Sequence, residues 1–120
     1  MEDTRREQRE ALQALTEYSP RLLQAMKNAA EELDGNRQPD TDGYLDSIIK
    51  GMNWELQILN ATMDYINEDH TEIDKTAVNT VITEFNTAYQ KKDDKVISEL
   101  LKEEVILLFE KIAEAAQKKI

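Results

Sequence analysis

The sequence lacks cysteine, and it holds only three glycines, two prolines and one histidine among 120 residues. Without cysteine the chain cannot form disulfides, thiolate metal sites or a cysteine nucleophile. Scarce glycine and proline, together with abundant Glu, Lys, Leu and Ala, favour helices over sheets. A single histidine cannot supply the paired Glu-x-x-His motifs of a two-metal helical bundle. We therefore expect an all-α protein that holds no metal and no cofactor.

The chain also lacks a long hydrophobic run. Its longest strongly apolar stretch, residues 105–109, is far shorter than the roughly 20 residues that span a bilayer. The N-terminus, MEDTRREQRE, is densely charged and has no apolar stretch of the kind found in a signal peptide. We expect a cytoplasmic protein that does not insert into a membrane.

Basic residues are missing from residues 51–74, although this stretch holds six of the acids of a chain whose net charge is −10. Such a surface repels phosphate groups, so nucleic acids and anionic membranes are poor partners. A polypeptide with basic or apolar faces remains compatible with this charge.

The N-terminal third shows two helical segments. Residues 3–17 are rich in Glu, Gln, Arg, Ala and Leu. Ser19 and Pro20 are typical of an N-cap and a first helical residue, for a second segment that runs to Leu33 and stops at Gly35. Apolar residues also recur every three or four positions straight through Pro20, so one kinked helix is the alternative.

Three more helices follow, at about residues 42–67, from 73 or 74 to about 89, and from 93 or 94 to near the C-terminus. The first of these has the clearest apolar stripe, formed by Leu45, Ile49, Met52, Leu56, Leu59, Met63 and Ile66. The pattern predicts an antiparallel, up-down four-helix bundle in one domain, residues 1–120. Residues 1–17 would form an N-terminal helical arm or kinked extension, and residues 18–120 would form the bundle.

The helix at residues 42–67 carries a second apolar face opposite this stripe. That face contains Tyr44, Gly51, Trp54, Ile58, Ala61 and Tyr65. In one interpretation the N-terminal segment or another bundle helix covers it. In the other it is a groove for a partner helix, with Tyr44, Trp54, Ile58 and Tyr65 as the binding residues. Leu12 and Leu15 of the arm would then occupy the groove until a partner arrives.

Glu104 is the second unusual feature, because apolar residues surround it three and four positions away on the last helix. A carboxylate inside an apolar arc must reach the edge, find a donor or be protonated. We expect a buried polar node that accepts from the Trp54 indole, a Tyr hydroxyl or a Lys. A lone carboxylate makes a poor catalytic site, and His70 is expected in an exposed loop, so we predict no enzyme activity and no catalytic residue.

Three segments, residues 18–23 (YSPRLL), 48–54 (IIKGMNW) and 93–104 (DDKVISELLKEE), resemble an uncharacterised family of small helical proteins from Gram-positive bacteria. A second, weaker resemblance is to the flagellin-specific export chaperones, on the helix order, Ser19-Pro20 and residues 59–64 (LNATMD). The first resemblance implies a small bacterial helical bundle. The second implies a cytoplasmic protein that shields helices of an unassembled partner in apolar grooves.

The leading hypothesis is a non-catalytic helical protein-binding module, chaperone-like or adaptor-like, that buries the amphipathic helix of a partner. The alternative is a structural homo-oligomer, a dimer paired through the helix at residues 42–67.

Overall fold

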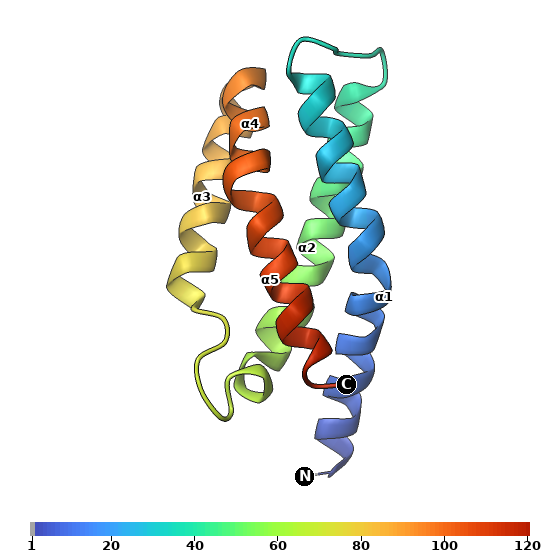
Figure 1. Cartoon of the computed structure of the whole chain (residues 1–120), viewed down its shortest axis with the longest axis vertical. Helices are drawn as coiled ribbons and strands as arrows, with labels where there is room; N and C mark the ends of the chain where they lie inside the picture. The colour runs from blue at the N-terminus through green and yellow to red at the C-terminus, as the bar shows by residue number, and fades with distance from the viewer. Residues whose placement is uncertain (1) are drawn as a thin grey trace.

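A computed structural model describes residues 2–120 (Figure 1). The first three helices are α1 (Glu2–Leu33), α2 (Thr41–Ile66) and α3 (Lys75–Lys91). The fourth, called here the C-terminal helix, joins α4 (Asp94–Leu100), a π-helical turn η1 (Leu101–Val105) and α5 (Ile106–Gln117). No strand occurs in the described part of the chain, and the all-α prediction is confirmed there.

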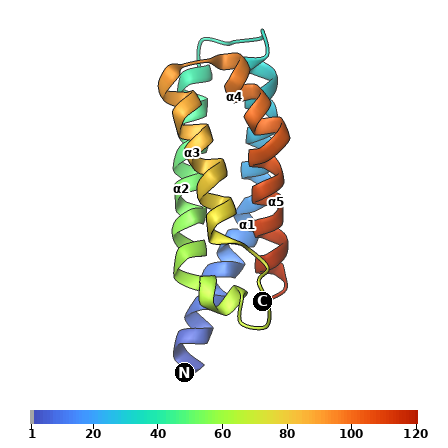
Figure 2. The ribbon, with the colours of Figure 1, turned by 90° about the vertical axis from the view of Figure 1, so that its left-hand side faces the viewer.

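The four helices lie lengthwise in a molecule that measures 49 × 24 × 18 Å. The C-terminus and the start of α1 lie at one end, and the links α1–α2 and α3–α4 lie at the other (Figures 1 and 2). α1 packs against α2 and the whole C-terminal helix, whereas α3 packs mainly against the C-terminal helix. α1 is therefore the central element for packing, and its first turns reach past the neighbouring helix ends.

α1 continues through Pro20, so the alternative of one continuous helix is the one observed, and Ser19 is not an N-cap. Proline has no N–H for the carbonyl four residues earlier. The carbonyl that loses its donor here is that of Thr16. The hydroxyl of Ser19, one residue before the proline, donates to the adjacent carbonyl of Leu15 at 2.9 Å. Buried residues on both sides of the proline hold the helix together: Leu12, Leu15, Leu22 and Met26. The predicted arm is thus the N-terminal half of α1.

Side-chain caps mark the starts of α3 and α4. The carboxylates of Asp74 and Asp93 accept from the backbone N–H groups of Thr76 and Val96, at 3.1 and 3.3 Å. Gly35, with φ of 89°, follows the end of α1 as predicted. The observed helix ends fall within about two residues of the expected ones.

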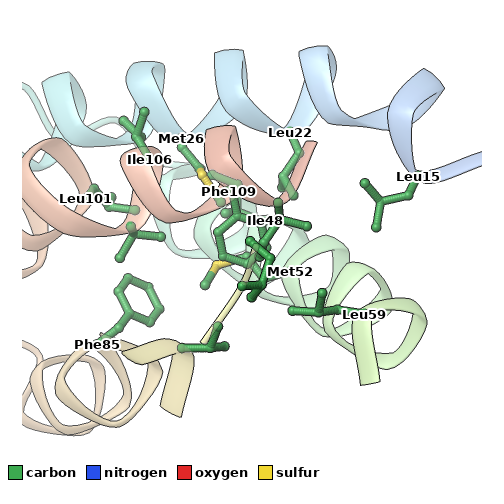
Figure 3. Close-up of a cluster of buried hydrophobic side chains, with 14 of the residues drawn as sticks. Leu15, Leu22, Met26, Ile48, Met52, Leu59, Phe85, Leu101, Ile106 and Phe109 are labelled. Atoms are coloured by element: carbon green, nitrogen blue, oxygen red, sulfur yellow. The ribbon is translucent and has the colours of Figure 1, made fainter. Parts of the chain in front are cut away.

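The core lies where α1, α2, α3 and the C-terminal helix converge (Figure 3). Its largest fully buried apolar side chains include Met26, Leu59, Phe85, Leu101, Phe109 and Ile112. On α2 the central buried stripe is Leu45, Ile48, Met52, Glu55, Leu59, Thr62 and Ile66. The predicted stripe shares four of these positions, but its Ile49, Leu56 and Met63 are only half-buried.

The C-terminal helix contains a π-helical turn that the sequence did not reveal. The N–H of Ile106 donates to the carbonyl of Leu101, five residues back rather than four. The wider turn lets Leu101 and Ile106, five residues apart, both face the core, whereas an α-helix would place them about 140° apart. It also sets the direction of Glu104, which lies within it.

Candidate protein-binding surfaces

The second apolar face of α2 is covered by α1. The Tyr18 ring meets the Trp54 ring edge-on, with centroids 5.4 Å apart and an interplanar angle of 87°. Gly51 leaves room for the Tyr18 hydroxyl, which a Cβ at that position would overlap. Trp54 remains 40% exposed, whereas Tyr44 and Ile58 are half-buried. The predicted groove is therefore occupied by the chain itself.

The remaining predicted binding residues are also enclosed. Leu12 and Leu15 have no exposed surface, and they belong to the core rather than to a detachable arm. Tyr65 is buried between two cations, with the Arg5 guanidinium 4.7 Å and the Lys119 ammonium 5.0 Å from its ring centroid. Its hydroxyl donates to the Lys119 carbonyl, at 3.2 Å. The six predicted residues thus do not form an open site.

Glu104 is half-buried and is not the predicted buried node. A hydrogen bond with the carboxyl of Glu84 on α3 raises the pKa of Glu104, and desolvation and the nearby Glu103 raise it further. None of the donors expected from sequence, the Trp54 indole, a Tyr or a Lys, reaches it among the described residues. The π-helical turn directs Glu104 towards α3 instead of the core.

Glu55 on α2 is the buried carboxyl of this protein, and the sequence analysis did not identify it. Glu55 has no exposed surface. Oε2 accepts from the Ser19 hydroxyl at 3.0 Å, and Oε1 has no partner. Burial raises the pKa of Glu55 to about 7, while the Ser19 hydrogen bond lowers it in part. The sequence contains one indication of this burial: Glu55 lies between Met52 and Leu59, three and four residues from these two members of the apolar stripe.

An open groove lies between α3 and the C-terminal helix, with a volume of about 450 Å³. We call it the Leu107 groove, after the most exposed large apolar residue of the described chain, which is 59% exposed. Its apolar floor consists of Ala77, Val81, Leu107 and Leu108. Its rim carries Glu103, Glu104, Glu110 and Glu114, with Lys111 as the basic residue among the lining residues.

The rim carboxylates of the Leu107 groove are not neutralised within the protein. The ion pairs of residues 2–120 involve other acids, such as Asp42, Glu68, Glu72 and Asp94, and none involves the four rim glutamates. Crowded carboxylates also disfavour each other, as the raised pKa of Glu104 beside Glu84 shows. The groove therefore combines apolar lining residues with four glutamates, none of which forms an ion pair among the described residues, and one lysine, Lys111.

Other chemistry finds little support in the described residues. No group of three or more His, Cys, Asp or Glu side chains within residues 2–120 could hold a metal ion. His70 is exposed, and its Nε2 lies 2.7 Å from a Glu72 carboxylate oxygen. None of the helices in the described part is both long enough and apolar enough to cross a membrane.

The helix arrangement and the surface define a small all-α domain with an apolar groove along one pair of helices. The family model of a domain of unknown function (DUF8042) matches residues 10–115, so the chain belongs to that family. This agrees with the expected uncharacterised family of small helical proteins. No curated protein and no solved structure matches the chain.

Proposed function

We propose that this protein is a non-catalytic binding module that buries the apolar face of a partner's amphipathic helix in the Leu107 groove. One observation carries the proposal: a large apolar side chain, Leu107, stands 59% exposed on the floor of a groove rimmed by glutamates. A groove between two helices suits a third helix, whose apolar residues recur every three or four positions. Exposed apolar surface with a polar rim is typical of interaction sites.

The charge of the groove indicates a basic partner. Four rim glutamates and a chain charge of −10 attract Lys and Arg residues that flank an apolar stripe. A second copy of this chain, paired groove to groove, would instead bring like charges together. We therefore favour a partner of opposite charge over the homodimer, which remains the alternative.

The proposal moves the binding surface away from the α2 face expected from sequence. Binding there would require removal of the N-terminal half of α1, which buries Leu12 and Leu15 completely. Exposing a buried leucine costs about 1.5–3 kcal/mol. The Leu107 groove needs no such opening, since its floor is already accessible to a partner.

Several further features belong to the same proposal. We propose an up-down antiparallel topology, supported by the positions of both chain ends (Figure 1). We also propose a bacterial, cytoplasmic protein with no nucleic-acid partner, supported by the acidic charge. A chaperone-like or adaptor-like role follows from the resemblance to export chaperones, since such a protein shields the helices of its partner.

Calorimetry with the full-length protein tests the proposal. The probe is a synthetic helical peptide of about 18 residues, about 27 Å long, with Leu on one face and Lys along both flanks. We expect binding that weakens with salt, because the rim contacts are screened. Leu107→Ser should weaken it about tenfold, equivalent to about 1.4 kcal/mol.

Two controls make the calorimetric test specific. The first is a peptide with the same Leu face and Glu on its flanks, which the acidic rim should repel. The second is Ile120→Ser, which removes another exposed apolar residue (48% exposed) outside the groove. The proposal is wrong if the Lys peptide does not bind, if the Glu peptide binds equally well, or if both variants lose affinity alike.

A further inference from the structure

The side chains of Ser19 and Glu55 form a buried contact between α1 and α2, with 2% and 0% of their surfaces exposed. The Ser19 hydroxyl oxygen lies 3.0 Å from Glu55 Oε2 and 2.9 Å from the carbonyl oxygen of Leu15. A hydroxyl carries one hydrogen, so it cannot donate to both oxygens at once. When Glu55 is ionised, Ser19 can donate fully to only one of the two oxygens. When Glu55 is protonated, the direction of their bond reverses: Glu55 donates to the Ser19 oxygen, and Ser19 donates to the Leu15 carbonyl.

The surroundings of Glu55 supply no counter-charge. Burial raises the pKa of Glu55, the Ser19 hydrogen bond lowers it in part, and no charged side chain contributes. On α1 the neighbouring titratable group is Tyr18, whose hydroxyl lies against Gly51 of α2. On α5 the acids nearest to Ser19 are Glu110 and Glu114, which line a cavity on its other side. An ionised Glu55 would therefore be a buried and uncompensated charge.

A route to solvent passes beside Pro20. A surface cavity of about 310 Å³ between α1 and α5 is lined by Thr16, Ser19 and Pro20, so the serine lies between this cavity and Glu55. Pro20 has no N–H, so the helix lacks a backbone hydrogen bond at this point. A small opening of α1 is therefore easier here than elsewhere along the helix.

We propose that Ser19 and Glu55 form a proton-controlled joint, in which protonated Glu55 holds α1 closed on α2 and loss of that proton loosens α1 around Pro20. In this step the Ser19 oxygen takes the proton from Glu55, and the Ser19 hydroxyl turns away from the Leu15 carbonyl to release its own hydrogen to solvent in the cavity. The joint uses α1 and α2, whereas the Leu107 groove uses α3 and the C-terminal helix. The two proposals can therefore fail independently.

Carbon-13 NMR of the glutamate side-chain carboxyls in the full-length protein tests the protonation. The resonance missing in Glu55→Gln assigns Glu55. We expect its midpoint near neutral pH. Ser19→Ala should raise the midpoint further, because Ser19 bonds the ionised carboxylate more strongly than the protonated carboxyl. Ser98→Ala is the matched control, since Ser98 is another buried serine, bonded to the Ala30 carbonyl at 2.8 Å. A midpoint between pH 4 and 5, or equal shifts in both serine variants, would overturn the joint.

Hydrogen exchange tests the loosening. After correction for the intrinsic rate, the amides of residues 17–23 should lose about tenfold in protection between pH 6 and pH 8, because the closed state keeps a proton that the open state releases. In Glu55→Gln this change should vanish, since the amide cannot ionise. An equal loss of protection in Glu55→Gln, or a loss spread evenly over all helices, would contradict the proposal.

Discussion

Gly51 shows how one residue sets the spacing between α1 and α2. A Cβ at this position would overlap the Tyr18 hydroxyl and lie 3.1 Å from a methyl carbon of Leu22. Overpacking of this kind costs about 1–3 kcal/mol. The gain in helix propensity offsets about 1 kcal/mol of this cost. We therefore expect Gly51→Ala to lower the free energy of unfolding by up to about 2 kcal/mol in urea denaturation.

Two further variants separate overpacking from helix propensity. Tyr18→Phe in the Gly51→Ala background should recover part of the loss, because it removes the overlapping oxygen. Gly43→Ala, in the same helix with no atom near its Cβ position, should be neutral or stabilising by up to about 1 kcal/mol. If Gly51→Ala and Gly43→Ala behave alike, Tyr18 does not set the spacing of the two helices.

Glu55 makes stability depend on pH. Its pKa is about 7 in the folded protein, against an ordinary 4.5, so between these values the folded state keeps a proton that the unfolded state has lost. The contribution of protonated Glu55 to the free energy of unfolding is therefore fully present below pH 4.5. It falls by about 3 kcal/mol as the pH rises to 7 and stays constant above that.

Glu55→Gln should remove this dependence, because its amide can donate to Ser19 without ionising. Measured by urea denaturation, the stability of the variant relative to wild type should rise by about 3 kcal/mol from pH 4 to pH 8. Other carboxyls, such as Asp94 with its lowered pKa beside Arg37, titrate alike in both proteins and cancel. A difference that stays constant with pH would mean that Glu55 ionises normally.

Residue patterns explain why the sequence missed Glu55. The predicted and the observed stripes of α2 share Leu45, Met52, Leu59 and Ile66, and both advance by alternating steps of three and four. At the positions between these four, the predicted stripe has Ile49, Leu56 and Met63. The observed stripe has Ile48, Glu55 and Thr62 instead. Hydrophobicity favours the first set, but contact with α1 buries the second, and polar partners such as Ser19 on α1 are distant in sequence.

At the scale of elements, the sequence located the helices well and their irregularities poorly. Capping signals are local, so Asp74, Asp93 and Gly35 could be identified without a structure. The continuity of α1 through Pro20 depends on its burial against α2 and the C-terminal helix. Helix propensity is a local property, so it does not predict this burial. The π-helical turn likewise depends on fitting Leu101 and Ile106 into the same core.

The π-helical turn holds one residue more than an α-helical turn would. Deleting the exposed Glu103 should convert it to α-helix and leave the core register on both sides unchanged. Deleting the exposed Lys111 of α5 should instead rotate every later core residue away from the core by about 100°. Circular dichroism should therefore show a folded, cooperative Glu103 deletion and a strongly destabilised Lys111 deletion. Equal destabilisation would mean that the extra residue is not absorbed in this turn.

At the scale of the whole molecule, the negative charge has two uses. Some acids form ion pairs within the protein, such as Asp42 and Asp94, which lie 2.8 and 2.9 Å from the Arg37 guanidinium. Others, above all the four glutamates of the Leu107 groove, face solvent without a counter-ion. The sequence analysis found acids without basic residues at residues 51–74 and a second apolar face on the helix at residues 42–67, so both features pointed to α2. The structure places this combination between α3 and the C-terminal helix, because α1 already covers α2.

The most direct test of this account is a nitrogen-15 NMR titration of the full-length protein with the Lys-flanked amphipathic peptide. The account predicts that the largest changes in amide chemical shift fall in residues 77–84 and 103–114, the two sides of the Leu107 groove. Changes centred on residues 44–65 around Trp54, or spread evenly over the molecule, would contradict it.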